Sequence, residues 1–235
     1  MIKLDQEGRR FAKLTPRPQG DLMRRHKVKD FIFNSPDVFF AELGQRLFLI
    51  GKDVQPARMS TARMDLLAVD EQGHAVVIVL SDGPDPSLLA RAITCAGFVS
   101  EWKPKDFLGL LTAEQTERLK AFLEVSPSQI NREQRAILIS EFFDFEVLAA
   151  TKWLWERNQM DHTCVRIFAC TDPQTSAEYL GCMDLTDSMV SEVVLNTARP
   201  ALLRQAESTQ EPPDDAADKA ASGSAPASEA QVVAR

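Results

Sequence analysis

Asp65 is the residue of this chain best placed to do chemistry, because it is an acid inside an otherwise apolar run. Residues 63 to 81 read R-M-D-L-L-A-V-D-E-Q-G-H-A-V-V-I-V-L-S, two apolar stretches joined by a short polar turn. This layout predicts a β-hairpin. An ionised carboxylate in an apolar strand is costly unless it is paired. We therefore expect Asp65 to pair with Arg63, Arg91 or backbone N–H groups, to act as a residual metal ligand, or to lie in a partly exposed position.

The other reactive side chains form no recognisable catalytic or metal-binding motif. The cysteines show no C-x-x-C spacing, and the three histidines are scattered along the chain. There is no glycine-rich phosphate loop and no serine nucleophile motif. The sequence therefore predicts no cofactor, and it predicts that the four cysteines are reduced, buried thiols. They are Cys95, Cys164, Cys170 and Cys182.

Length and composition indicate one domain in a soluble globular protein. The chain has 235 residues, of which 44% are hydrophobic and 26% charged. No apolar run reaches the roughly 18 residues that a membrane helix needs. The first ten residues lack the apolar segment of a secretory signal. We expect a cytoplasmic protein with no membrane partner.

The charge is unevenly distributed along the chain. The formal net charge is −7, yet residues 1–30 hold nine Lys or Arg and only four Asp or Glu. Residues 206–235 hold six acids and two bases and have no apolar periodicity. We predict a basic N-terminal hairpin or arm at 1–19, an α/β domain at 20–204 and a disordered acidic tail at 205–235. The basic segment is either a solvated surface or an edge that contacts phosphates.

Periodicity and turn residues predict the elements that position Asp65. The Ser35-Pro36 pair is typical of a helix start, and Gly44 of a helix end. The predicted order of helix, three strands, helix, strand, helix and strand indicates a mixed β-sheet flanked by helices. Helices are predicted at 21–33, 36–43, 87–102, within 104–124 and at 145–157, and strands at 47–54, 63–69, 75–80, 136–140 and 164–169. Residues 179–184 are compatible with a further strand, and residues 188–198 with a further helix.

Aromatic residues gather around the predicted helix at 145–157. Trp153 and Trp155 lie within it, and Phe142, Phe143 and Phe145 precede or begin it. We expect this group to pack against the sheet. Stacking on nucleic-acid bases is the alternative.

Three segments resemble the PD-(D/E)XK nuclease superfamily, which has a restriction-endonuclease-like αβββαβ core. A-R-M-D-L-L-A-V-D-E-Q-G-H-A-V-V-I is similar to the family stretch G-R-I-D-L-L-A-x-D-x-x-G-x-x-V-V-I-E-x-K. N-S-P-D-V-F, residues 34–39, resembles an N-P-x-x-L element after the first helix. I-L-I-S-E-F-F-D-F-E-V-L-A-A-T-K-W-L resembles a segment common in bacterial members. The likeness covers residues 20–170 and implies the family's fold.

The resemblance also implies which catalytic positions are missing. Family enzymes cleave phosphodiesters with Mg²⁺ held by an aspartate and a glutamate, and a lysine assists the attacking water. Asp65 stands at the aspartate position, but Val79 replaces the glutamate and Ser81 the lysine. Arg91 occupies a helix position where the family tends to keep an amide. We expect no catalytic residues, with Asp65, Val79 and Ser81 as vestigial positions, and no metal site, with Asp65 as a residual candidate ligand.

Three functions fit this reading. The first is a catalytically inactive nuclease-like protein that binds DNA or RNA. The second is a protein-interaction scaffold, with another protein or a second copy as partner. The third is an active metal-dependent endonuclease whose rearranged site combines Asp65 with Asp53, Asp82 or Glu42. For the first function, the predicted nucleic-acid-binding residues are Arg24, Arg25, Lys27, Arg58, Arg63 and Arg91.

Overall fold

A computed structural model describes residues 2–5, 10–16, 27–57 and 60–186 of the chain. All of them belong to the first of two units into which the chain divides, Met1–Ala198. The second unit, Arg199–Arg235, lies outside the described residues. The predicted helix at 188–198 and the predicted acidic tail lie outside them too.

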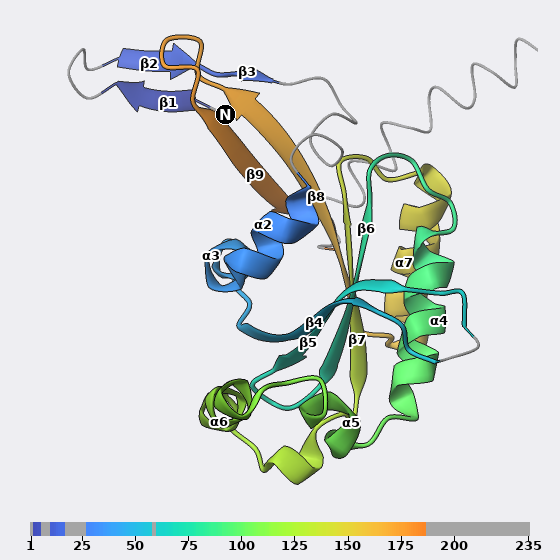
Figure 1. Cartoon of the computed structure of the whole chain (residues 1–235). Coiled ribbons are helices and arrows are strands. Elements are labelled where there is room, and N and C mark those ends of the chain that lie inside the picture. Colours follow the sequence, from blue (N-terminus) through green and yellow to red (C-terminus); the bar gives the residue numbers. More distant parts are fainter. Residues whose placement is uncertain (1, 6–9, 17–26, 58–59, 187–235) are drawn as a thin grey trace, which may run out of the picture. The chain divides into compact units, whose positions relative to one another are not determined.

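The described residues form an α/β fold around a mixed seven-stranded sheet (Figure 1). Its strand order is β3-β8-β7-β6-β5-β4, and β9 also pairs with β8. The pairs β4–β5 and β5–β6 are antiparallel, whereas β6–β7 and β7–β8 are parallel. The prediction of a mixed sheet flanked by helices is therefore confirmed. The strands of this sheet are β3 (Thr15–Pro16), β4 (Leu47–Val54), β5 (Met64–Asp70), β6 (Ala75–Ser81), β7 (Gln134–Ser140), β8 (His162–Thr171) and β9 (Glu178–Asp184).

The predicted N-terminal hairpin is also present. Strands β1 (Ile2–Asp5) and β2 (Arg10–Lys13) pair antiparallel as a separate two-stranded sheet. Thr15 and Pro16, which fall in the predicted arm at 1–19, instead join the large sheet by pairing with Thr171 and Cys170 of β8.

The helices lie close to their predicted positions. The helix predicted at 21–33 is confirmed from Val28 onward, and residues 21–26 lie outside the described residues. Gly44 has a φ of 64°, which suits a glycine shortly after a helix end. The helices are α2 (Val28–Asn34), α3 (Pro36–Ala41), α4 (Leu88–Ser100), α5 (Pro104–Leu108), α6 (Ala113–Phe122), the 3-10 helix η1 (Pro127–Gln129) and α7 (Phe145–Asn158).

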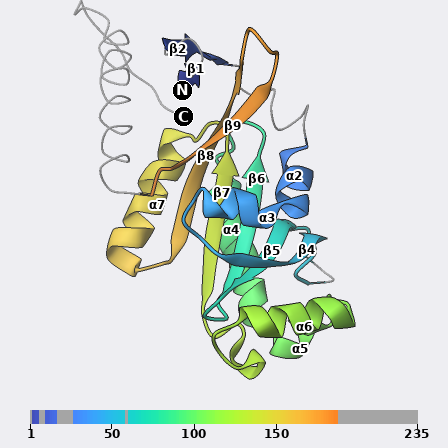
Figure 2. The ribbon, with the colours of Figure 1, turned by 90° about the vertical axis from the view of Figure 1, so that its left-hand side faces the viewer.

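The sheet is buried on both faces, which explains why its central strands read as nearly continuous apolar runs. One face, which includes Val79, packs against α4 and α7. The other face, which includes Ile78, packs against α2 and α3. Figure 1 shows these two pairs of helices on opposite sides of the strands. Figure 2 shows α5 and α6 together at one end of the sheet.

The aromatic group near α7 is less buried than expected. Phe143 is buried, but the tryptophans Trp153 and Trp155 are 58% and 49% exposed. Each helical residue turns by about 100°, so residues 153 and 155 lie to either side of Leu154. Leu154 is the residue that packs toward the sheet. The prediction that both tryptophans pack in the core is therefore wrong.

All four cysteines are free thiols, as predicted. Cys95, Cys164 and Cys170 are buried, and Cys182 is half-buried. Burial raises the pKa of Cys164 to about 12 and that of Cys182 to about 11. Both thiols therefore stay protonated near neutral pH, which makes them poor nucleophiles. In the part of the chain that the structure describes, no helix is both long and apolar enough to cross a membrane.

Candidate functional site

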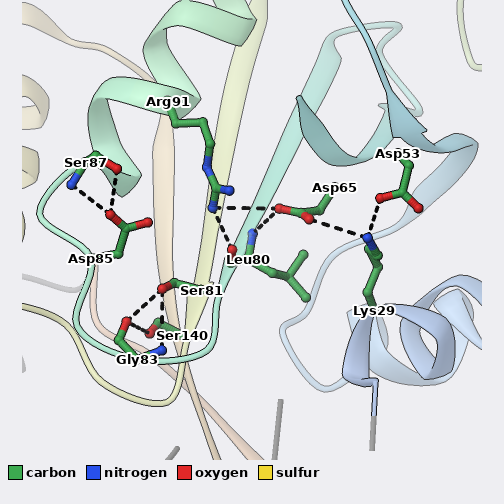
Figure 3. Close-up of polar contacts among 10 residues, drawn as sticks. All are labelled: Lys29, Asp53, Asp65, Leu80, Ser81, Gly83, Asp85, Ser87, Arg91 and Ser140. Atoms are coloured by element: carbon green, nitrogen blue, oxygen red, sulfur yellow. Dashed lines mark hydrogen bonds and ion pairs between the residues drawn. The ribbon is translucent and has the colours of Figure 1, made fainter. Parts of the chain in front are cut away.

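Asp65 lies near the start of β5, beside the end of β6. Leu66 pairs with Ile78 across the β5–β6 ladder, and Asp65 and Val79 are the next residue on each strand. The β-hairpin predicted over residues 63–81 is therefore confirmed, with Asp65 and Val79 on its two strands. Figure 3 shows Asp65 between α2 on one side and α4 on the other.

The Asp65 carboxylate has three polar neighbours. Oδ2 accepts a 2.7 Å hydrogen bond from the Leu80 backbone N–H and lies 3.8 Å from an Arg91 nitrogen. Oδ1 lies 3.6 Å from Lys29 Nζ. Arg91 itself donates a 2.6 Å hydrogen bond to the Leu80 carbonyl oxygen, which fixes its guanidinium beside β6. Of the predicted partners, Arg91 and a backbone N–H are thus confirmed, whereas Arg63 is exposed just before β5.

Lys29 connects Asp65 to a second aspartate, Asp53. Its Nζ donates a hydrogen bond to Asp53 Oδ1 (Figure 3). Desolvation by burial lowers the pKa of Lys29, but the hydrogen bond to Asp53 and the charges of both aspartates outweigh it and raise the pKa above its ordinary value. Lys29 is therefore a firmly protonated cation in the folded protein.

A β-bulge determines that Asp53 is the residue opposite Asp65. The β4–β5 register shifts by one residue between Leu49 and Gly51. After the shift, Lys52 pairs with Leu66 and Val54 with Met64, so Asp53 and Asp65 stand opposite one another. Without it, Lys52 would take that place. Asp53 also has a φ of 55°, a left-handed conformation that aspartate tolerates better than most residues.

Lys29, Asp53 and Arg91, which surround Asp65, border a pocket of about 500 Å³. Its lining carries three cations, Lys27, Lys29 and Arg91, and four aspartates. The aspartates are Asp30, Asp53, Asp82 and Asp85, and Val28, Leu80 and Ser81 complete the lining. Much of this charge is already paired. Besides the Lys29 and Arg91 contacts, Asp30 accepts a 2.7 Å hydrogen bond from Lys52, and Asp85 accepts bonds from Ser87.

The two positions where the family motif would carry a glutamate and a lysine have structural roles here. Val79 has no exposed surface and pairs with Leu138 in the parallel β6–β7 ladder. Ser81 is buried, and its hydroxyl donates a 2.7 Å hydrogen bond to the Gly83 carbonyl oxygen. One side chain thus completes the core, and the other closes the turn after β6.

The structure brings together only part of the predicted site. Asp53 and Asp82 line the pocket, whereas Glu42 is not among its lining residues. Of the three acids in the rearranged-site hypothesis, Asp53 shares a cation, Lys29, with Asp65. Of the predicted nucleic-acid contacts, Lys27 is exposed at the pocket and Arg91 is turned toward Asp65. Arg24, Arg25 and Arg58 lie outside the described residues.

Lys29 is the site residue that sequence reasoning missed. The helix α2 buries Val28 and Ile32, and Lys29 follows Val28 directly. A lysine at the border of a buried helix face can extend its side chain along that border toward a nearby acid. This spacing was the available signal, but the sequence does not indicate which acid the lysine reaches.

Within the described ranges, no three His, Cys, Asp or Glu side chains are grouped as a metal site would need. Comparison with known proteins found no matching family model, no matching curated protein and no matching solved structure. The fold and the geometry of the pocket are therefore the basis for any functional assignment.

Proposed function

We propose that this chain is a catalytically inactive protein with a PD-(D/E)XK-like fold that acts by binding another macromolecule. One observation carries the proposal: the Asp65 carboxylate is flanked by two cations of the chain itself, Lys29 at 3.6 Å and Arg91 at 3.8 Å. A divalent ion at Asp65 would have to approach these two positive charges. The order of helix, three strands, helix and strand in the described chain supports the family's αβββαβ core.

Positions 79 and 81 are a second argument against catalysis. Magnesium in nuclease sites is held by carboxylates, water and substrate oxygens in a nearly octahedral shell. Val79, at the position of the second carboxylate, offers no ligand and is enclosed in the core. Ser81, at the position of the lysine, cannot supply a cation, and its hydroxyl is bonded to Gly83. At these two positions the chain therefore offers neither the family's second carboxylate nor its assisting lysine.

A protein is the partner that the described surface favours. The pocket lining carries four aspartates against three cations, so it does not form the positive surface that would attract phosphates. The helix α4 presents exposed Ile93 and Phe98, which are 39% and 40% accessible. Arg91, its only charged residue, is half-buried and turned toward Asp65. An exposed helix face without charges is typical of a protein-binding surface.

Nucleic acid is the second candidate, and it rests on different residues. Lys27 and Arg63 are exposed, and residues 1–30 carry a net positive charge. These cations could contact a phosphate backbone without any contribution from the pocket. For either partner we propose a cytoplasmic location, which is supported by four free thiols in one chain.

The decisive experiment combines cleavage, metal-binding and nucleic-acid-binding assays on the full chain. We expect no Mg²⁺- or Mn²⁺-dependent cleavage of plasmid DNA, single-stranded DNA or RNA, and no Mn²⁺ binding in calorimetry. Cleavage that disappears in Asp65→Asn would overturn the proposal and establish the rearranged endonuclease. Tight fluorescence-anisotropy binding to a polynucleotide, lost in Lys27→Glu with Arg63→Glu but kept in the control Lys105→Glu, would establish nucleic acid as the partner.

A further inference from the structure

Asp53 and Asp65 form an unusual pair because two carboxylates face one another across adjacent strands. Their opposed positions follow from the register of β4 and β5. Like charges directly opposite in a sheet destabilise it. The Asp65 side chain is only 21% exposed, so water screens it poorly, whereas Asp53 is 47% exposed. This pair therefore needs a positive charge between its members.

The charge between them comes from Lys29. Its ammonium contacts Oδ1 of Asp53 and lies 3.6 Å from Oδ1 of Asp65, so one cation serves two carboxylates from two strands. The other oxygen of Asp65 is held separately by the Leu80 N–H. Carboxylates that share one cation are also a common way for proteins to bind divalent metal ions. Here the Lys29 ammonium stands in the place of such an ion.

The two other cations near this pair, Arg91 and Lys52, do not lie between Asp53 and Asp65. Arg91 approaches Asp65 Oδ2 and is tied to the Leu80 carbonyl, so it does not stand between the two aspartates. Lys52 donates to Asp30 and covers the Phe33 ring at 5.4 Å. Lys29 alone, among the described cations of this pocket, contacts both Asp53 and Asp65.

We propose that Lys29 is an internal blocking group, whose ammonium keeps divalent cations out of a position between Asp53 and Asp65. The proposal rests on the proposed function, since it explains why two facing carboxylates at the edge of this pocket would hold no divalent ion. It also goes beyond the proposed function, because it assigns the absence of metal binding to a single side chain, which one substitution can remove. Lys29 lies in the first turn of α2, so either displacement of this turn or loss of the lysine charge lifts the block.

The test is the substitution Lys29→Met, which keeps the length of the side chain and removes its charge. Mn²⁺ is the probe, measured by calorimetry and by the unfolding midpoint in EDTA and in Mn²⁺. A unit charge about 4 Å from the ion is worth enough, even at a high effective dielectric constant, for a gain in Mn²⁺ affinity of about 100-fold. We expect this gain, together with a Mn²⁺-dependent rise of the unfolding midpoint that the parent chain does not show.

Two control variants isolate the site. Lys52→Met removes the same charge nearby but frees only one carboxylate, Asp30, so it should not gain Mn²⁺ binding. Asp53→Asn combined with Lys29→Met should lose the gain. Absence of a gain in Lys29→Met, or an equal gain in Lys52→Met, overturns the proposal.

The remaining outcomes are equally decisive. Lys29→Gln, which keeps a hydrogen-bond donor, replaces Lys29→Met if that variant does not fold. If neither variant folds in EDTA, refolding on addition of Mn²⁺ supports the proposal, and failure to refold overturns it. Mn²⁺ binding or cleavage by the parent chain would instead refute the proposed function, so the two failures are distinguishable.

Discussion

Substitution of Val79 by glutamate tests whether this position stands where a nuclease would hold its second carboxylate. Val79 has no exposed surface, and it lies one residue beyond the Leu66–Ile78 pair, on the strand next to Asp65. Burial of such a side chain contributes about 2 kcal/mol, which a polar replacement forfeits. Val79→Gln should therefore lower the free energy of unfolding by about 3 kcal/mol, including its unsatisfied amide.

The glutamate adds the cost of a charge. Without a metal, the introduced carboxylate is enclosed beside Asp65, and both burial and the like charge raise its pKa in the folded state. We expect Val79→Glu to be about 2 kcal/mol less stable than Val79→Gln at pH 8. Because the folded pKa is raised, the penalty is absent below the unfolded pKa of about 4.3 and grows as the pH rises from there to the folded pKa.

Urea denaturation of the two variants between pH 4.5 and pH 8 (about the range in which the glutamate ionises) measures this gap. Val79→Gln is the matched control, since it has the same size and no charge. A difference in the free energy of unfolding that stays near zero across this range would refute the placement of residue 79 in an enclosed position beside Asp65. A difference that grows with rising pH would support it.

Two further predictions follow from single contacts. A Cβ added at Gly181 of β9 would lie 2.5 Å from ring atoms of Phe168 on β8, so Gly181→Ala should displace the ring and lower stability by about 1 kcal/mol, measured by urea denaturation. The loss should shrink when Phe168→Ala is present, and an additive result would contradict the contact. The raised pKa of Lys29 means that its contribution to stability is complete below the unfolded pKa of about 10.4 and is lost as the pH rises through the folded pKa. Between neutral pH and about pH 11, the midpoint of thermal unfolding should therefore fall more for the parent than for Lys29→Met. Midpoints that fall in parallel for the two proteins would count against the ion pairs of Lys29.

Local patterns determined most of the fold. The apolar run at 75–80, with turn residues on both sides of it, predicted β6. The Ser35-Pro36 pair predicted the start of α3. Strand β4 has its predicted bounds, Leu47–Val54. These elements could be predicted because hydrophobic periodicity and chain-breaking residues act over a few neighbouring positions. The order of antiparallel and parallel strands followed from the lengths of the connections between them.

The contacts of the candidate site could be predicted only in part from the sequence. Asp65 was identified because a charge in an apolar strand needs a partner, and Arg91 was correctly named as one partner. Lys29 was not, since it lies 36 positions before Asp65 and on a helix packed against the other face of the sheet. Trp153 and Trp155 were misplaced for a related reason, because apolar character does not state which side of a helix meets the core.

The chain by itself therefore determined the elements, their order and the acid that requires neutralisation. Tertiary structure decided what neutralises it. The one-residue bulge between Leu49 and Gly51 puts Asp53 opposite Asp65, and the packing of α2 brings Lys29 to both. A shift of one residue exchanges the faces of a strand, and no local pattern fixes such a shift. It depends on how the strand and the helix pack together, which is a property of the folded chain as a whole.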